Sequence, residues 1–376
     1  ANGIAAYAVG TTSCNIGNDF LLWEGDNNFH PTIGQNMYRV EELPNGCSRI
    51  EHIGMSWLKH GFCALQGTLC GSCSNPAPGG CPPILGWNCS DPYSSGNNGS
   101  QSGLGPKSEV NASTGFFPYP YSSPSSPATI GRRLNVFSAD MSLASYPASS
   151  TNYFVEGQYI HPQDAAACKS FNNASYREVT RSGNLNNGYD LNLINSTRQM
   201  VPAIYAWQEI DPSVEIRTFE LSRCSTSGLN ETFHIGVKVC DIGNGMWHYE
   251  YAVYNLDCDR AFQSFEVPIN GTYDMLTAAG RMAIAYNDSA TGFACYVAAA
   301  LSALPTLMTV ADELVQRLQE ELGERGPAAV QPPHLRVHVA RAHAHEGDPG
   351  PGHGELLDEH VQRRLGTPVR RDRAHL

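Results

Sequence analysis

Several residue types are missing from the end of this chain. Residues 297–376 contain no Cys, Asn, Lys, Phe, Tyr or Trp, although the whole sequence has 12 Cys, 26 Asn and 35 aromatic residues. The same segment holds 9 Arg and 7 of the 13 His. Arg without Lys, Asn or aromatics is what GC-rich DNA encodes in an unintended reading frame. We therefore predict two parts, 1–296 and 297–376, and interpret the second as a frame shift or a foreign fusion.

Basic residues are also scarce. The chain has 24 Lys and Arg against 36 Asp and Glu, a net charge of −12. Without a basic stripe that could neutralise phosphates, nucleic acid is not an expected partner. No apolar run approaches the roughly 20 residues that span a bilayer, because the longest candidate, 297–310, is interrupted by Pro305. We expect no membrane span, and the sequence indicates no particular oligomeric state.

Well-known catalytic signatures are absent as well. No phosphate-binding Gly-rich loop or Rossmann fingerprint follows a predicted strand, so a nucleotide cofactor is not expected. The Gly-X-Ser-X-Gly pattern of serine hydrolases does not occur. Cys70 and Cys73 have a CxxC spacing, but no second CxxC completes a zinc ribbon. A disulfide is the better interpretation of that spacing.

The cysteines that are present point to an oxidising compartment. Their number is even and all precede residue 297, which predicts a disulfide framework and secretion. The chain begins at Ala1 without a charged or apolar leader, as expected of a mature protein after signal-peptide removal. The predicted disulfide residues are Cys14, Cys47, Cys63, Cys70, Cys73, Cys81, Cys89, Cys168, Cys224, Cys240, Cys258 and Cys295.

Acceptor sequons for N-glycosylation are frequent in the first part. If the host glycosylates, they mark surface loops, although Asn-rich turns explain them equally well. The eight candidates are Asn88, Asn98, Asn111, Asn173, Asn195, Asn230, Asn270 and Asn287.

Alternating apolar residues predict a mainly β protein. Apolar and polar residues alternate from Phe233 to Cys240, a turn follows at 241–245, and an aromatic-rich strand resumes at 246–255. Shorter apolar segments at 4–9, 21–23, 37–40, 50–65 and 262–269 are typical of further strands. We predict an antiparallel β sandwich. The alternation of side chains places His234 and His248 on the same face of the hairpin, so they could contact each other across its two strands.

Two segments depart from this pattern. Residues 71–131 are rich in Gly, Ser, Pro and Asn but also carry aromatics and cysteines, which predicts a long ordered loop stapled by disulfides. Leucines at three- and four-residue steps between Leu301 and Leu322 predict a helix. Beyond it, Pro, Arg, His and Gly without a period predict a poorly ordered end.

Histidines are the candidates for a metal site. His30, His60 and His161 are each flanked by aromatics and by Pro or Gly, a setting that can hold an imidazole rigidly. Neutral imidazole suits copper or zinc, which could support redox or hydrolytic chemistry. No His-X-His or His-Glu-X-X-His spacing joins them, so a structural role for each His is the alternative.

Other functions stay open. Exposed Tyr, Trp and Asn on loops would suit a noncatalytic module that binds extracellular polysaccharide or builds surface structure. Paired carboxylates would suit a glycoside hydrolase. Turns at 241–245 and 255–259 could hold calcium but have ordinary turn composition. The carboxylates available for hydrolysis are Glu156, Asp164, Glu209, Asp211, Glu215 and Glu250.

Four stretches together carry a family resemblance. Residues 54–62 (GMSWLKHGF), 89–93 (CSDPY), 99–106 (GSQSGLGP) and 247–253 (WHYEYAV) resemble a planctomycete-type family of large secreted bacterial proteins. The resemblance covers about residues 8–270. It implies secretion and a mostly β fold and carries no catalytic role. It also implies further β structure with a His/Asp-rich segment after the hairpin, where this chain has its atypical end.

Overall fold

A computed structural model describes most of the first 258 residues with their side chains. The ranges are 3–74, 79–123, 130–184, 188–220, 231–244 and 247–258. The backbone alone is described at 221 and 246 and in four strands, 264–268, 284–285, 294–302 and 334–338. Throughout these ranges the protein is mainly β with antiparallel pairing, as predicted.

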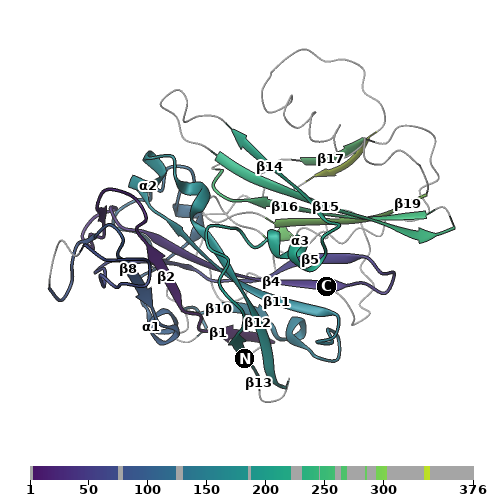
Figure 1. Ribbon diagram of the computed structural model, residues 1–376, viewed down its shortest axis with the longest axis horizontal. Coiled ribbons are helices and arrows are strands. Elements are labelled where there is room, and N and C mark those ends of the chain that lie inside the picture. Colours follow the sequence, from purple (N-terminus) through teal and green to yellow (C-terminus); the bar gives the residue numbers. More distant parts are fainter. Residues whose placement is uncertain are drawn as a thin grey trace, which may run out of the picture.

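The first half of the chain builds a nine-stranded sheet (Figure 1). Its main path runs β1-β10-β5-β4-β11-β12-β13, with β6 paired to β4 and β9 paired to β6. The strands are β1 (Ile4–Tyr7), β4 (Thr32–Glu42), β5 (Ser48–Met55), β6 (Leu58–His60), β9 (Leu104–Gly105), β10 (Leu134–Phe137), β11 (Thr151–Ile160), β12 (Ala174–Asn184) and β13 (Gly188–Leu193).

A second sheet contains the predicted hairpin. Its order is β14-β15-β16-β19-β18, and three two-stranded sheets, β2-β8, β3-β7 and β17-β20, complete the described β structure. The strands are β14 (Glu215–Leu221), β15 (Glu231–Gly243), β16 (Met246–Asn255), β18 (Ile284–Ala285), β19 (Ala294–Ser302), β2 (Thr11–Cys14), β8 (Ser90–Tyr93), β3 (Leu21–Leu22), β7 (Ile84–Leu85), β17 (Ser264–Pro268) and β20 (His334–His338).

Helices are few and short in the described ranges. Three α-helices and three 3-10 turns connect the strands, and none of these helices is long and apolar enough to cross a membrane. They are α1 (Ser95–Ser100), α2 (Pro162–Ala166), α3 (Tyr205–Ile210), η1 (Lys107–Glu109), η2 (Ser138–Met141) and η3 (Ser170–Asn172).

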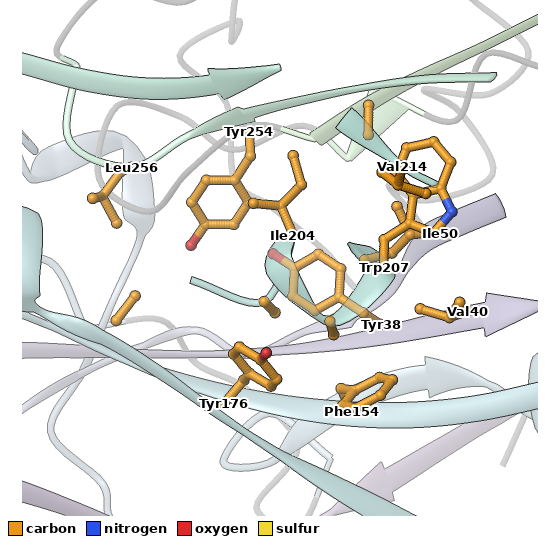
Figure 2. Close-up of a cluster of buried hydrophobic side chains, with 14 residues drawn as sticks. Tyr38, Val40, Ile50, Phe154, Tyr176, Ile204, Trp207, Val214, Tyr254 and Leu256 are labelled. Carbon is orange, nitrogen blue, oxygen red and sulfur yellow. The ribbon is translucent and has the colours of Figure 1, made fainter. Parts of the chain in front are cut away.

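One buried cluster joins the two sheets. Tyr38 and Phe154 from the nine-stranded sheet, Trp207 from α3 and Tyr254 from β16 belong to it, as Figure 2 shows. Trp207 is fully buried and its indole nitrogen donates to the Ser48 hydroxyl at 2.9 Å. Burying such large side chains contributes about 2 kcal/mol each, which makes this cluster a main source of cohesion between the sheets.

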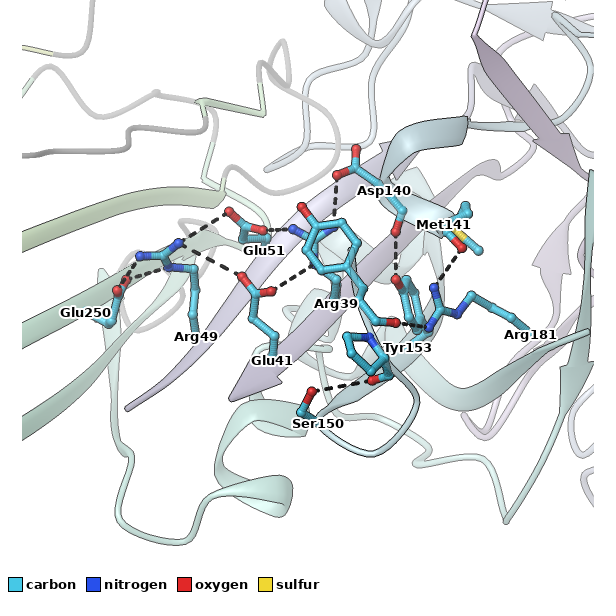
Figure 3. Close-up of polar contacts among 12 residues, drawn as sticks. Arg39, Glu41, Arg49, Glu51, Asp140, Met141, Ser150, Tyr153, Arg181 and Glu250 are labelled. Carbon is cyan, nitrogen blue, oxygen red and sulfur yellow. Dashed lines mark hydrogen bonds and ion pairs between the residues drawn. The ribbon is translucent and has the colours of Figure 1, made fainter. Parts of the chain in front are cut away.

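Charged and covalent contacts reinforce that junction. Arg49 on β5 pairs with Glu250 on β16, and further acidic and basic side chains of β4 and β5 extend the network (Figure 3). A disulfide between Cys47 and Cys240 links the β4–β5 turn to β15. These contacts join segments about two hundred positions apart, since the disulfide alone spans 193 residues.

The other disulfides staple the beginning of the predicted loop. Cys14–Cys70, Cys63–Cys81 and Cys73–Cys89 all lie within the first 89 residues. Cys168 is disulfide-bonded as well, and Cys258 is buried. Cys224 and the side chain of Cys295 lie outside the described residues. Four disulfides of this kind fit an extracellular protein.

The predicted hairpin is confirmed, but its two histidines do not meet. In the register of β15 and β16, His234 lies opposite Tyr254 and His248 lies opposite Cys240. His248 instead contacts Glu250, with 2.6 Å between Nε2 and Oε1, and His234 contacts the Thr218 hydroxyl at 2.9 Å. The two histidines do lie on the same face of the hairpin, but His248 pairs with Cys240, which is six residues along β15 from His234.

The described parts of the C-terminal segment are strands. β19 runs across position 296 and pairs with β16, so that Tyr296 lies opposite Ala252. Strand geometry therefore extends through Ser302, where the leucine pattern predicted the start of a helix, and β20 adds a strand where poor order was predicted. The remainder of the predicted helix, 303–322, lies outside the described residues. The boundary near Tyr296 stays a prediction.

The predicted glycosylation sites differ in exposure. Asn88 and Asn195 are exposed, while Asn111 and Asn173 are partly buried. Asn98 is fully buried, and its amide donates to the Val9 carbonyl and the Thr11 hydroxyl at 2.9 Å each. The folded chain therefore does not present Asn98 as an acceptor, because the sequon occurs in a helix packed on β2. Asn230, Asn270 and Asn287 lie outside the described residues.

Candidate functional site

A tight loop positions His30 just before β4. The backbone of Glu24 donates to the Phe29 carbonyl at 3.0 Å, and the Asn27 side chain accepts from the Phe29 amide at 2.7 Å. Nδ1 of His30 lies 2.6 Å from the Glu24 carbonyl oxygen. A carbonyl can only accept, so Nδ1 carries the proton and donates.

The nine-stranded sheet positions His60. Its strand β6 pairs with β4, which places His60 opposite Thr32, and with β9 on the other side. The imidazole packs against Gly105 of β9. A Cβ on Gly105 would lie 2.5 Å from Nε2 of His60, closer than real atoms approach. Gly105 therefore leaves the space that this imidazole occupies.

The two imidazoles meet directly. Nε2 of His30 lies 2.9 Å from Nδ1 of His60, and both residues are buried. Because Nδ1 of His30 carries that ring's proton, its Nε2 is the acceptor and His60 donates through Nδ1. The sequence proposed these two residues as partners without a spacing that joined them, and the structure brings them together.

Both rings are held in the neutral form. Burial lowers the pKa of His60 to about 3, and the nearby His30 lowers it further. Burial also lowers the pKa of His30, partly offset by its hydrogen bond to the Glu24 backbone. Neutral imidazole is the form that binds metal ions.

Aromatic side chains enclose the pair. Tyr121 stacks on His60 with ring centroids 3.5 Å apart and planes 6° apart. Phe117 lies 4.9 Å from the His30 ring and 4.7 Å from the His60 ring, and Phe62 lies 5.8 Å from His30. This enclosure provides the desolvation that lowers both pKa values.

Three exposed aromatics lie on the two loops that carry His30 and Phe117, and we call them the aromatic rim: Phe29, Phe116 and Tyr119. Their exposed fractions are 44%, 57% and 45%. The two loops are joined, because the Asn28 amide donates to the Phe117 carbonyl at 3.2 Å and the Tyr119 hydroxyl donates to the Gly25 carbonyl at 3.1 Å. Exposed apolar rings fixed on adjoining loops are typical of a binding surface.

His161 has a different role. It precedes α2 as its N-cap, with Nδ1 accepting from the Gln163 amide at 3.1 Å and Nε2 lying 2.6 Å from the Leu22 carbonyl. Its ring stacks on Trp23. Both nitrogens are occupied by backbone groups, so in this arrangement no lone pair is available for a metal. The sequence did not predict the capping role of His161, because a capping histidine is recognised from backbone geometry and not from a residue pattern.

The described residues contain no group of three or more His, Cys, Asp or Glu side chains that could hold a metal ion.

The six carboxylates considered for hydrolysis do not pair with one another in any described contact. Their partners are amide, hydroxyl or cationic groups, such as Asn36 for Glu156, Arg198 for Glu209 and Arg49 for Glu250. The turn at 241–243 is closed by its own hydrogen bond from the Gly243 amide to Asp241.

Sequence reasoning missed part of this site. Phe117, Tyr121 and Gly105 were known only as members of a long loop, and nothing in their spacing relates them to His30 or His60. The close succession Gly103-Leu104-Gly105 was the one available signal, since paired glycines often mark a close approach of backbone to another group.

Comparisons with protein-family models, with curated proteins and with solved structures find no match to this chain.

Proposed function

We propose that this chain is a secreted extracellular β protein that binds copper or zinc through His30 and His60. The observation that carries the proposal is the 2.9 Å separation between Nε2 of His30 and Nδ1 of His60. Two metal–nitrogen bonds of about 2.0–2.1 Å meeting near a right angle span about that distance. When His60 adopts the tautomer with its proton on Nε2, both facing nitrogens carry a lone pair that can bind a metal ion.

The environment of His30 supports the same proposal. Histidines that bind metals usually donate their other ring nitrogen to a carbonyl or carboxylate, which fixes the tautomer. His30 makes that bond to the Glu24 carbonyl at 2.6 Å. Because His30 and His60 are the only two imidazoles that meet here among the described residues, we propose that the remaining coordination positions take water or a substrate group. A copper ion there would supply redox chemistry, and a zinc ion would polarise a bound oxygen.

Secretion is part of this proposal. Four described disulfides favour an oxidising compartment, and the resemblance to planctomycete-type secreted proteins agrees with it. We also propose that the nine- and five-stranded sheets act as the layers of a sandwich, because the buried cluster of Tyr38, Trp207 and Tyr254 lies between them.

The test is metal analysis of untagged protein after exposure to copper or zinc and desalting. Since the C-terminal segment contains His343, His345 and His353, the reference protein carries Ala at these three positions. We expect about one ion per chain in this reference and a loss of binding in His30→Ala and His60→Ala, with His248→Ala as the matched control. Below about 0.2 ions per chain, unchanged by the His30 and His60 substitutions, the metal proposal fails.

The aromatic rim favours a second candidate function, binding of extracellular polysaccharide. Phe29, Phe116 and Tyr119 present apolar faces of the kind that stack on sugar rings. We expect retention on insoluble cellulose or chitin to be lost in the double variant Phe116→Ala/Tyr119→Ala. Phe171→Ala removes an aromatic of similar exposure elsewhere and should retain binding. Equal retention of all three proteins would exclude the rim as the binding surface.

A further inference from the structure

A second cluster of buried polar groups lies on the face of the nine-stranded sheet that packs against the five-stranded sheet. Asn36 on β4 lies directly opposite Glu156 on β11 in the sheet register. Lys107, the first residue of η1, reaches the same place from the long loop. These three residues are separated by 71 and 120 positions, respectively, from Asn36. Their meeting is therefore a product of the tertiary structure.

The three side chains form a line with the amide in the middle. Nζ of Lys107 lies 3.4 Å from Oδ1 of Asn36, and Nδ2 of Asn36 donates to Oε1 of Glu156 at 2.9 Å. An amine is thus in contact with the carbonyl side of an amide, while a carboxyl group holds the nitrogen side. Oδ1 is bonded to Cγ of the same amide, so this contact brings the amine next to the carbon that it would attack.

Glu156 is fixed by further donors. The Tyr254 hydroxyl donates to Oε1 at 3.0 Å, the Tyr38 hydroxyl does so at 3.4 Å, and the Ala203 amide donates to Oε2 at 2.6 Å. Both tyrosines belong to the buried cluster between the sheets (Figure 2). The carboxyl group is therefore held in one orientation toward Asn36 by residues of both sheets.

Burial shifts the protonation of Lys107 and Glu156 toward their neutral forms. The exposed fractions are 1% for Asn36, 2% for Glu156 and 8% for Lys107. Burial lowers the pKa of Lys107 to about 7, against the opposing effect of Glu156. Burial also raises the pKa of Glu156, which four hydrogen bonds partly offset. A substantial neutral fraction of Lys107 is therefore present near neutral pH, and a neutral amine is a nucleophile.

We propose that Lys107 and Asn36 become joined by an intramolecular isopeptide bond, with Glu156 carrying the proton that the reaction moves. Nζ of Lys107 attacks Cγ of Asn36 and forms the new C–N bond. The bond between Cγ and Nδ2 of Asn36 breaks, and Nδ2 leaves as ammonia. Glu156, which contacts Nδ2, delivers a proton to the departing nitrogen, and the proton that Nζ loses when the new bond forms replaces it. The atoms balance with the loss of one ammonia, and no oxidant or reductant is needed.

The bond would complete the stapling of the long loop. The disulfides Cys14–Cys70, Cys63–Cys81 and Cys73–Cys89 tie the loop only as far as residue 89. A link from Lys107 to β4 would anchor the loop's next segment, next to β9 and its contact with His60. Unlike the disulfides, it would resist reduction.

Peptide mapping of the wild-type protein, secreted, reduced and alkylated, tests the proposal. The joined chain should have a mass about 17 Da below that of its sequence, the mass of one ammonia. Trypsin should not cleave after Lys107, so that the peptide 60–132 remains attached to the peptide 1–39 that contains Asn36. Recovery of 1–39 and 60–107 as separate peptides, with no mass deficit, would overturn the proposal without depending on any variant.

Variants identify the roles of the three residues. Asn36→Ala and Lys107→Met should restore the full sequence mass, and Glu156→Gln should leave most of the protein unjoined. Lys59→Met removes the other buried lysine of this region, whose amine contacts Gln35, and should keep the cross-link. A deficit that persists in Lys107→Met would place the loss of ammonia at another residue and would equally refute the proposal.

Discussion

Arg49 on β5 and Glu250 on β16 form a two-bond ion pair between the sheets. Nε and the terminal nitrogen of Arg49 donate to Glu250 at 3.0 and 2.5 Å, and the side chain of Glu250 is fully buried (Figure 3). Glu41 and Glu51 approach the same guanidinium only to 4.0 Å. Glu250 is therefore the main compensation for the buried charge of Arg49.

Replacing Glu250 by Gln tests that contact. The substitution keeps the volume but leaves Arg49 without its closest counter-charge, so we expect a loss of about 3 kcal/mol in the free energy of unfolding, measured in urea. The exposed pair Arg217–Glu215 provides the control, and Glu215→Gln should cost less than about 1 kcal/mol. Equal costs for both variants would show that burial does not set the strength of this pair.

Removing the disulfide between the sheets should destabilise more than removing a local one. Cys47–Cys240 spans 193 residues and Cys73–Cys89 spans 16. Chain entropy predicts about 5 and about 3 kcal/mol, with the first value an upper bound because other disulfides already restrain the enclosed loop. Denaturant unfolding of the two double Cys→Ser variants measures the difference. A larger effect at Cys73–Cys89 would contradict the expected order.

Asp257 should make the fold less stable as the pH rises. Burial raises its pKa to about 7, and the negative charges of Glu231, Asp164 and Glu220 add to that. The folded state then holds a proton that the unfolded state has released, so stability falls between about pH 4 and pH 7 and the full cost is present above pH 7.

The substitution Asp257→Asn should relieve that cost. Its carbonyl can still accept from the Thr232 amide, a bond of 2.5 Å in the native chain. We expect a gain on the order of 2 kcal/mol at pH 8 that disappears by about pH 4, measured by denaturant titrations across this range. A gain that does not depend on pH would mean that ionisation of Asp257 is not its cause.

Gly105→Ala should damage the histidine pair specifically. The new methyl group would lie 2.5 Å from Nε2 of His60, which must turn away from His30. We expect copper or zinc affinity to fall about tenfold or more, the range found when groups that orient a ligand are lost. Gly80→Ala adds a methyl group where nothing lies within 4 Å and serves as the control. Isothermal titration of both variants gives the comparison, and equal affinities would contradict the role of Gly105.

Local patterns predicted the parts of the fold that depend on neighbouring residues. The alternation from Phe233 to Cys240 and the turn after it predicted β15 and β16, because both follow from backbone preferences within a few residues. The leucine pattern near Leu301 was less reliable. Its first leucine, Leu301, lies in β19, since pairing with β16 outweighs helical periodicity there.

The candidate site was only partly predictable. Flanking residues selected His30, His60 and His161 together, but only the first two meet. The pairing of Thr32 with His60 between β4 and β6 brings them together, and no local pattern encodes that register. His161 does not join them, because its ring is bonded to the backbone carbonyl of Leu22.

The sequence by itself determined the chemical setting of this protein: a disulfide-stapled, acidic, mainly β chain whose composition changes near Tyr296. These properties follow from residue counts and short-range alternation. Only the tertiary structure decided which groups lie together, the His30–His60 pair and the contacts of Lys107 and Glu156 with Asn36. Both arise from strand register and loop packing across tens of residues, where the contacts depend on the whole core rather than on any segment of it.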